Sequence, residues 1–258
     1  MNLNSSVQSG HQFNAAQLGS ILANDREPHA ARGLVEERLP FTVRIVTSQE
    51  QLDKAVLIRH SAYGRHVPEV ASLLEKEEVA DSEPGSVVLL AESKLDGSPV
   101  GTMRIQTNRY RKLALEQSVE LPSWLEGGSH AEATRLGVAL GRTGRLVKTA
   151  LFKAYYQFCV MEGIEWMVIA ARSPLDRQYQ ALLFEDVFPD GGFIPMRHAG
   201  NIPHRVLAFN IDRARAVWSQ ANHPLYNFVI HTKHPDIDLD ATPGWISFQP
   251  RYRAKVAC

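Results

Sequence analysis

The chain has 258 residues, of which 44% are hydrophobic and 22% are charged, and its 28 basic residues balance 28 acidic ones. This composition is typical of a soluble globular protein with a sizeable core. The zero net charge carries no sign of a nucleic-acid binder, so we expect an electrostatic partner to be recognised by a local patch.

Neither cysteine, Cys159 or Cys258, has metal-ligand spacing, and no disulfide framework is indicated. No apolar run approaches the roughly 20 residues of a membrane-spanning helix, and the polar N-terminus lacks a signal-peptide core. We therefore expect a cytoplasmic protein with at most peripheral membrane contact and no nucleic-acid partner.

Three regions are predicted along the chain. Residues 1–40 read as a flexible or loosely docked arm with one short helix near residues 15–23. Residues 41–215 form the main domain, which opens with an alternating strand, FTVRIVT. A helix follows the N-cap Ser48, with Leu52, Val56, Arg59 and Tyr63 on one stripe. Residues 67–80 are a second helix or an ordered loop.

Two strands, at 86–93 and 99–107, flank the hairpin signal Asp96-Gly97. A strand at 130–138, a helix at 143–162, a strand at 165–171, a helix at 174–187 and two strands at 191–198 and 204–212 follow. Residues 216–258 are expected to form one helix and a wrapping extension. This order predicts an α/β (α+β) fold with a mixed, mostly antiparallel sheet and helices on both faces.

The stretch HAEATRLGVALGRTGRLVKTA, residues 130–150, allows more than one interpretation. In a single helix, Glu132 and Arg135 would form a surface pair, but three glycines disfavour that helix. In a regular strand the two side chains point to opposite faces. They share one face only if a β-bulge adds a residue between or beside them; otherwise they serve different sides of the sheet.

The helix at 143–162 has an apolar stripe made of Val147, Ala150, Leu151, Ala154, Tyr155 and Phe158. Its other side is expected to carry four bases: Arg142, Arg145, Lys148 and Lys153. Such a cluster at a helix start attracts phosphate or an acidic protein, and the alternative is a solvated basic face. The Gly141-x-x-Gly144 element matches no nucleotide-binding fingerprint.

Three motifs carry a resemblance to a known family. EATRLGV, from Glu132, resembles the Glu-x-x-Arg strand of acyl-homoserine-lactone (autoinducer) synthases, VGTMRI with Arg104 is similar to their Gly-x-x-Arg-Leu strand, and LIRHSAYGR resembles their Arg and aromatic cluster. The element order resembles the GNAT (N-acetyltransferase) fold. The longer tail is similar to that of FeeM-type long-chain N-acyl amino acid synthases, whose close relatives are PEP-CTERM/exosortase-associated acyltransferases. The resemblance covers residues 41–235 and implies a splay between the central strands.

The resemblance implies transfer of a fatty acyl group from a thioester to the amine of an amino acid. Aligned on Gly144, the coenzyme A loop of ordinary GNAT enzymes is broken, because Leu146 replaces a small residue. This departure favours an acyl carrier protein as partner over coenzyme A. No cofactor is expected besides the acyl-carrier or acyl-coenzyme A co-substrate, and no metal.

Glu132 is the candidate general base and Arg135 its catalytic companion, although a structural ion pair between them is the alternative. The acceptor carboxylate suits an arginine fork, so the candidates that bind substrate are Arg104, Arg59 and Arg135, with Tyr63 beside them. The alternative for each arginine is that it ties the N-terminal segment to the sheet. Backbone amides of Leu136, Gly137 and Val138 are candidates for the oxyanion. The acyl-carrier or phosphopantetheine site is assigned to Arg142, Gly144, Arg145 and Lys148.

Other features remain open. Tyr179 is either a proton donor for the thiolate or a packing tyrosine. An apolar tunnel for the acyl chain, or simply the core, is expected from Val168, Ile169, Phe184, Phe188, Phe193 and Met196. A metal site at His223, His231 and His234 is disfavoured because no carboxylate or cysteine cluster accompanies them.

Two rival functions remain. An autoinducer synthase would use S-adenosylmethionine, for which Glu77, Glu78 and Asp81 are an imperfect match to the family's acidic cluster. A module without catalysis would bind an acyl group or its carrier and would not depend on Glu132.

Overall fold

A mixed sheet organises residues 35–240, which are the residues that the computed structural model describes. Its strand order is β11-β2-β3-β4-β5-β6-β9-β7, and β8 pairs with β9. Only the β5–β6 and β11–β2 pairs are parallel. The strands are β2 Phe41–Ile45, β3 Ser86–Ser93, β4 Pro99–Thr107, β5 His130–Val138, β6 Trp166–Ala171, β7 Glu185–Asp186, β8 Ile194–Met196, β9 Ile202–Asn210 and β11 Ile237–Asp238.

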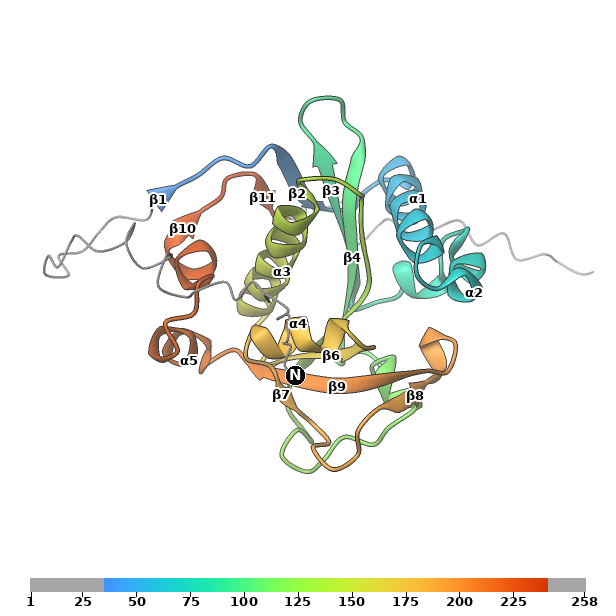
Figure 1. Ribbon diagram of the computed structural model, residues 1–258, viewed down its shortest axis with the longest axis vertical. Coiled ribbons are helices and arrows are strands. Elements are labelled where there is room, and N and C mark those ends of the chain that lie inside the picture. Colours follow the sequence, from blue (N-terminus) through green and yellow to red (C-terminus); the bar gives the residue numbers. More distant parts are fainter. Residues whose placement is uncertain (1–34, 241–258) are drawn as a thin grey trace, which may run out of the picture. The chain divides into compact units, whose positions relative to one another are not determined.

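Helices lie on both faces of the sheet, as the sequence predicted. Helix α1 Gln49–Gly64 covers one side of β4 and α3 Gly144–Met161 covers the other (Figure 1). Three shorter helices, α2 Pro68–Ala71, α4 Leu175–Ala181 and α5 Ala214–Gln220, lie in the connections. The predicted order of main elements and the mostly antiparallel sheet are confirmed.

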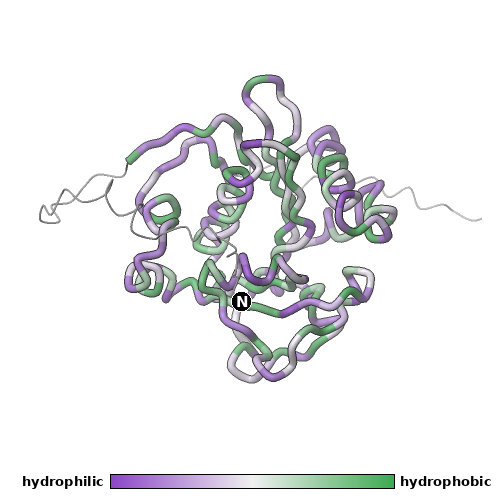
Figure 2. The backbone as a smooth tube through the Cα atoms, in the orientation of Figure 1, coloured by the Kyte–Doolittle hydropathy of each residue, from purple (hydrophilic) through white to green (hydrophobic). Residues whose placement is uncertain are grey.

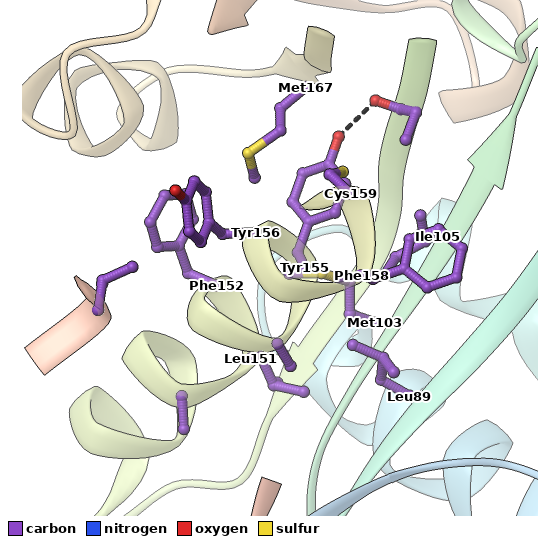
Figure 3. Close-up of a cluster of buried hydrophobic side chains, with 14 of the residues drawn as sticks. Leu89, Met103, Ile105, Leu151, Phe152, Tyr155, Tyr156, Phe158, Cys159 and Met167 are labelled. Atoms are coloured by element: carbon purple, nitrogen blue, oxygen red, sulfur yellow. Dashed lines mark hydrogen bonds between the residues drawn. The ribbon is translucent and has the colours of Figure 1, made fainter. Parts of the chain in front are cut away.

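The α3 face holds the apolar core (Figure 3). All six residues of the predicted α3 stripe are buried, and they pack against odd-numbered side chains of β3 and β4, such as Leu89 and Met103. The Tyr155 hydroxyl donates to the carbonyl of Ala131 and so ties α3 to β5. Cys159 is fully buried, burial raises the pKa of its thiol, and its expected role as a core residue is confirmed.

The α1 face is polar where it meets β4 and β5. Ser48 caps α1 by accepting from the Gln51 N–H, and hydrophilic and hydrophobic residues are mixed along the helix (Figure 2). Leu52, Val56 and Arg59 are buried on the predicted stripe. The even-numbered positions of β4 and β5 that face this side are buried and polar: Thr102, Arg104, Gln106, Glu132 and Thr134.

The segment after α5 packs on the core more closely than a loose extension. Strand β11 adds an edge to the sheet, and β10 Thr232–Lys233 pairs with β1 Val35–Glu36. The expectation that Lys153 belongs to an exposed basic side is wrong. Its buried ammonium donates to the Phe228 and Thr232 carbonyls and contacts His234 Nδ1 at 2.7 Å, because this C-terminal segment covers that side of α3.

One local expectation needs correction, and two others cannot be compared. The helix predicted at 174–187 ends at Ala181, because Leu183 adopts a left-handed conformation with φ 68° and the chain turns into β7. Of the two alternatives for residues 67–80, the ordered loop is the nearer one, because the segment holds only the four-residue α2 and short 3-10 turns. The helix near residues 15–23 and most of the arm lie outside the described residues. No helix within residues 35–240 is long and apolar enough to cross a membrane.

Three arginines and two carboxylates join the elements of the α1 face. Arg59 of α1 donates two bonds of 2.9 Å to Asp81, and Arg135 of β5 donates two bonds of 2.6 Å to Glu78. Arg104 of β4 reaches both, at 3.1 Å from Glu78 and 3.3 Å from Asp81. This arginine–carboxylate cluster therefore fixes residues 78–81 against α1, β4 and β5.

We expect Asp81→Asn to lower the free energy of unfolding by about 3 kcal/mol, since it removes the bidentate ionic partner of the fully buried Arg59 and leaves that guanidinium only the 3.3 Å contact with Glu78. Urea unfolding measures the change. Asp53→Asn is the matched control, because Asp53 is exposed and bonds only Gln49, and it should cost less than about 0.5 kcal/mol. Equal losses in the two variants would contradict the organising role of the cluster.

Candidate active site

A β-bulge in β5 includes Arg135, the second residue of the Glu-x-x-Arg motif. The β4–β5 register changes across it, from Arg104↔Thr134 to Thr102↔Gly137. One extra residue of β5 is accommodated there, and Arg135 has a φ of 56°. The bulge turns Arg135 to the face that carries Glu132. Because side chains alternate along a regular strand, the two residues could share a face only through a β-bulge, and that alternative is confirmed.

Glu132 is buried and only partly satisfied. Its side chain is 0% exposed, and Oε2 accepts a bond of 3.1 Å from the Leu115 N–H. Oε1 has no hydrogen-bond partner, and His198 Nε2 lies 3.8 Å from it. Burial raises the pKa of Glu132 to about 7, and the Leu115 amide and Arg104 oppose that rise only in part. The carboxyl can therefore both bind and release a proton near neutral pH.

His198 was missed from the sequence, because it stands at the end of the strand predicted at 191–198 and no motif marks it; β8 instead ends at Met196. It lies in a 3-10 turn after β8, and its carbonyl accepts a 2.9 Å bond from Arg135. Burial and the positive charge of Arg135 lower the pKa of His198 to about 4, so its ring is neutral at pH 7. A neutral imidazole beside Glu132 adds no charge that would hold the carboxyl ionised.

Glu78 behaves in the opposite way. Burial raises its pKa, but the hydrogen bond from Arg135 and the charges of Arg104, Arg135 and Arg59 outweigh burial and lower it to about 2. Glu78 is thus a permanent anion that takes up arginine charge, whereas Glu132 is left titratable.

The central strands splay apart beyond the bulge. β5 and β6 pair over only four residues, from His130↔Trp166 to Ala133↔Ile169. β5 then continues along β4, while β6 continues along β9. A cavity of about 290 Å³, named here the splay cavity, opens beside this separation. Its lining includes Tyr63, Leu136, Val138, Lys148, Leu175 and Tyr179.

A second cavity, of about 320 Å³, lies on the α1 face and is named here the cluster cavity. Arg104, Arg135 and His198 line it, and Ala114, next to the Leu115 amide that binds Glu132, does too. Both cavities are lined by Val70 and Arg135. Two ligands, one in each cavity, would therefore come close to each other beside Arg135.

Some residues of the sequence assignment line neither cavity. The Arg59 guanidinium is wholly buried against Asp81, and Gly137 faces α1, where a Cβ would lie 3.1 Å from the Arg59 Cα. Gly137 thus allows α1 to approach β5 closely. Glu132 itself lies behind the wall of the cluster cavity, next to His198.

The start of α3 holds the assigned carrier residues. Arg142 and Arg145 are exposed, Gly144 begins the helix, and no side chain caps its N-terminus. Lys148 is half-buried at the splay cavity, and burial together with Arg145 lowers its pKa. Leu146 is partly buried and packs against the core. The choice of an acyl carrier protein over coenzyme A stays a prediction.

The six residues expected to form an acyl tunnel do not line the splay cavity. Ile169 and Phe184 belong to the main core, Val168 and Met196 to a second apolar cluster, and Phe193 is 39% exposed beneath Arg205. Strand alternation sends Val168 and Ile169 to opposite faces of β6, where each packs into one of these two clusters. The half-buried ring of Tyr179 lines the splay cavity and also packs edge-on against Phe184, so both alternatives for this tyrosine stay open.

The three histidines of the tail make separate contacts. His223 stacks on Trp218, His231 lies against Tyr226, and His234 contacts Lys153. Among residues 35–240, no three metal-ligating side chains lie together.

Comparisons with known proteins match this geometry at the level of fold. No family model and no curated protein sequence matches the chain. Among solved structures, FeeM, an N-acyl amino acid synthase from uncultured soil microbes, is 18% identical, with a TM-score of 0.58 over 70% of this chain and 96% of FeeM. BjaI, a CoA-dependent acyl-homoserine lactone synthase, is 14% identical, with a TM-score of 0.50 over 80% of this chain and 98% of BjaI. The chain therefore has the GNAT-like fold of these acyl-transferring proteins, as the resemblance in its motifs predicted.

Proposed function

We propose that the protein is an N-acyltransferase that moves a fatty acyl group from an acyl carrier protein thioester to the amine of an amino acid. The observation that carries the proposal is the bulge in β5, which brings Arg135 to the face of the buried, titratable Glu132, between two cavities. One cavity suits the thioester and the other the acceptor.

In this reaction the acceptor nitrogen attacks the thioester carbonyl, so a C–N bond forms and the C–S bond breaks. The amine proton passes to Glu132, with His198 on the path from the cluster cavity. A carboxyl with a pKa near 7 accepts a proton readily at neutral pH and returns it to solvent afterwards. Tyr179 lines the splay cavity and is the candidate that protonates the leaving thiolate.

The splay cavity is the proposed donor site. Beyond Ala133, the β6-facing backbone edge of β5 has no strand partner, so amides near Leu136 and Val138 are open to the thioester oxygen. The uncapped N-terminus of α3 favours a phosphate. Exposed Arg142, Arg145 and Leu140, the last 80% exposed, offer an acidic carrier protein a basic and apolar surface.

Mass spectrometry of the products tests the proposal. The purified protein is incubated with acyl carrier protein thioesters of several chain lengths, with pooled amino acids, and in a parallel arm with S-adenosylmethionine. We expect N-acyl amino acids, and we expect Glu132→Gln to lower kcat about 100-fold, since it removes the base while keeping its shape. The control Glu126→Gln, at an exposed glutamate, should leave kcat unchanged.

The other outcomes are distinct. A lactone formed only with S-adenosylmethionine would identify an autoinducer synthase. Thioester binding without any product, equal in the wild type and in Glu132→Gln, would identify a binding module.

In the active enzyme, kcat should rise as the pH passes through about 7 and then level off, because Glu132 must be ionised to take the proton.

The donor assignment gives a second prediction. Arg142→Glu combined with Arg145→Glu should raise KM for the acyl carrier protein donor about tenfold or more, since the carrier is acidic, and added salt should raise the wild-type KM in the same direction. KM for an acyl-pantetheine thioester should stay the same. Arg213→Glu, a charge reversal beside α5, is the matched control. Efficient turnover of acyl-coenzyme A, with no effect of the reversals on the carrier reaction, would contradict an acyl carrier protein donor.

A further inference from the structure

The arginines that best suit an acceptor carboxylate already have partners. Both terminal nitrogens of Arg59 bond Asp81, and Arg135 uses Nε and Nη2 on Glu78. Arg104 donates from Nε to Thr134 and from Nη1 to the two carboxylates. None of the three therefore presents a free fork, and a bound carboxylate needs another cation.

The cluster cavity supplies two further cations. Its charged lining consists of Arg104, Arg111, Lys112, Arg135 and Arg197, against Glu78 and Glu83. Arg111 pairs with Glu83, and Glu78 is taken by the arginine–carboxylate cluster. Lys112 and Arg197 remain, and within residues 35–240 neither has a carboxylate within ion-pair distance. Their two positive charges are exposed at the same cavity.

These cations stand on the two segments that touch Glu132. Arg197 directly precedes His198, and Lys112 lies three residues before Leu115, whose amide binds the Glu132 carboxyl. Both backbones are held in place. The Arg197 N–H donates to Ser118 Oγ at 2.9 Å, and Leu113, next to Lys112, is fully buried.

The exposure of the lining side chains distinguishes the mouth of the cluster cavity from its interior. Lys112 and Arg197 are exposed, whereas Arg104 is 2% exposed and His198 is mostly buried against Glu132. An α-amino acid has its amine and its carboxylate on one carbon. If the carboxylate rests at the mouth, the amine points toward His198 and Glu132, where its proton is to be removed.

We propose that Lys112 and Arg197 form the binding site for the acceptor's carboxylate, so that the enzyme selects α-amino acids with a free carboxylate over amines without one. This assignment rests on the proposed N-acyltransferase function. The two exposed cations bind the anion, and the buried arginines shape the cavity through Glu78 and Asp81.

The test compares an amino acid that the wild type accepts with its carboxamide, which has the same side chain and amine but no carboxylate. We expect Arg197→Gln and Lys112→Gln each to lower kcat/KM for the amino acid about 10- to 100-fold, mainly through KM. For the carboxamide, kcat/KM should change less than about threefold. Arg177→Gln, at an exposed arginine of α4 outside both cavities, is the matched control.

A binding measurement separates failure of this inference from failure of the proposed function. NMR monitors the binding of amino acids to the Glu132→Gln protein, with and without Arg197→Gln or Lys112→Gln. Product formation with equal losses for amino acid and carboxamide, or with no loss, would overturn the inference alone. If the wild type makes no N-acyl product, but amino-acid binding disappears when Arg197→Gln is added, the carboxylate site is supported and the transferase function is rejected. Binding that is unaffected by both substitutions would overturn the inference whether or not product forms.

Discussion

The structure depends on an arginine–carboxylate cluster buried between α1 and the sheet. Arg59, Arg104 and Arg135 come from three separate elements, and Glu78 and Asp81 come from one short loop. Removal of so many charges from water is costly, and the cost is offset only when every partner is in place. The cluster therefore fixes the loop, the C-terminal half of α1 and the bulged end of β5 relative to one another.

The cluster also sets the electrostatics of the site. Three arginines alone would hold any neighbouring carboxyl ionised. Because Glu78 and Asp81 take up two of the three charges, burial dominates at Glu132 and raises its pKa to about 7. The same pairing leaves none of the three arginines with a free fork for a substrate anion. We therefore propose Glu132 as the base, and Lys112 and Arg197 as the residues that recognise the acceptor.

The sequence predicted the features that rest on periodicity. The α3 stripe and strand β5 follow from apolar spacing and glycine placement, and the alternation rule showed that a bulge was needed for Glu132 and Arg135 to share a face. Long-range packing was not predictable in this way. Strand β11 has only two residues, too few to show a period. The burial of Lys153 depends on the carbonyls of Phe228 and Thr232, which lie 75 and 79 residues away in the sequence. His198 lies in a turn beyond the end of β8, and no motif marks it.

The pKa of Glu132 is the central claim, and the difference in stability between the wild type and Glu132→Gln measures it most directly. A carboxyl with a pKa of about 7 in the folded protein and its ordinary value of 4.5 in the unfolded chain stabilises the folded state most at low pH. That contribution is lost as the pH rises from about 4.5 to 7. Urea unfolding across this range should show the wild type losing up to about 3 kcal/mol relative to Glu132→Gln. A difference that stays constant with pH, or one that favours the wild type as the pH rises, would contradict the account.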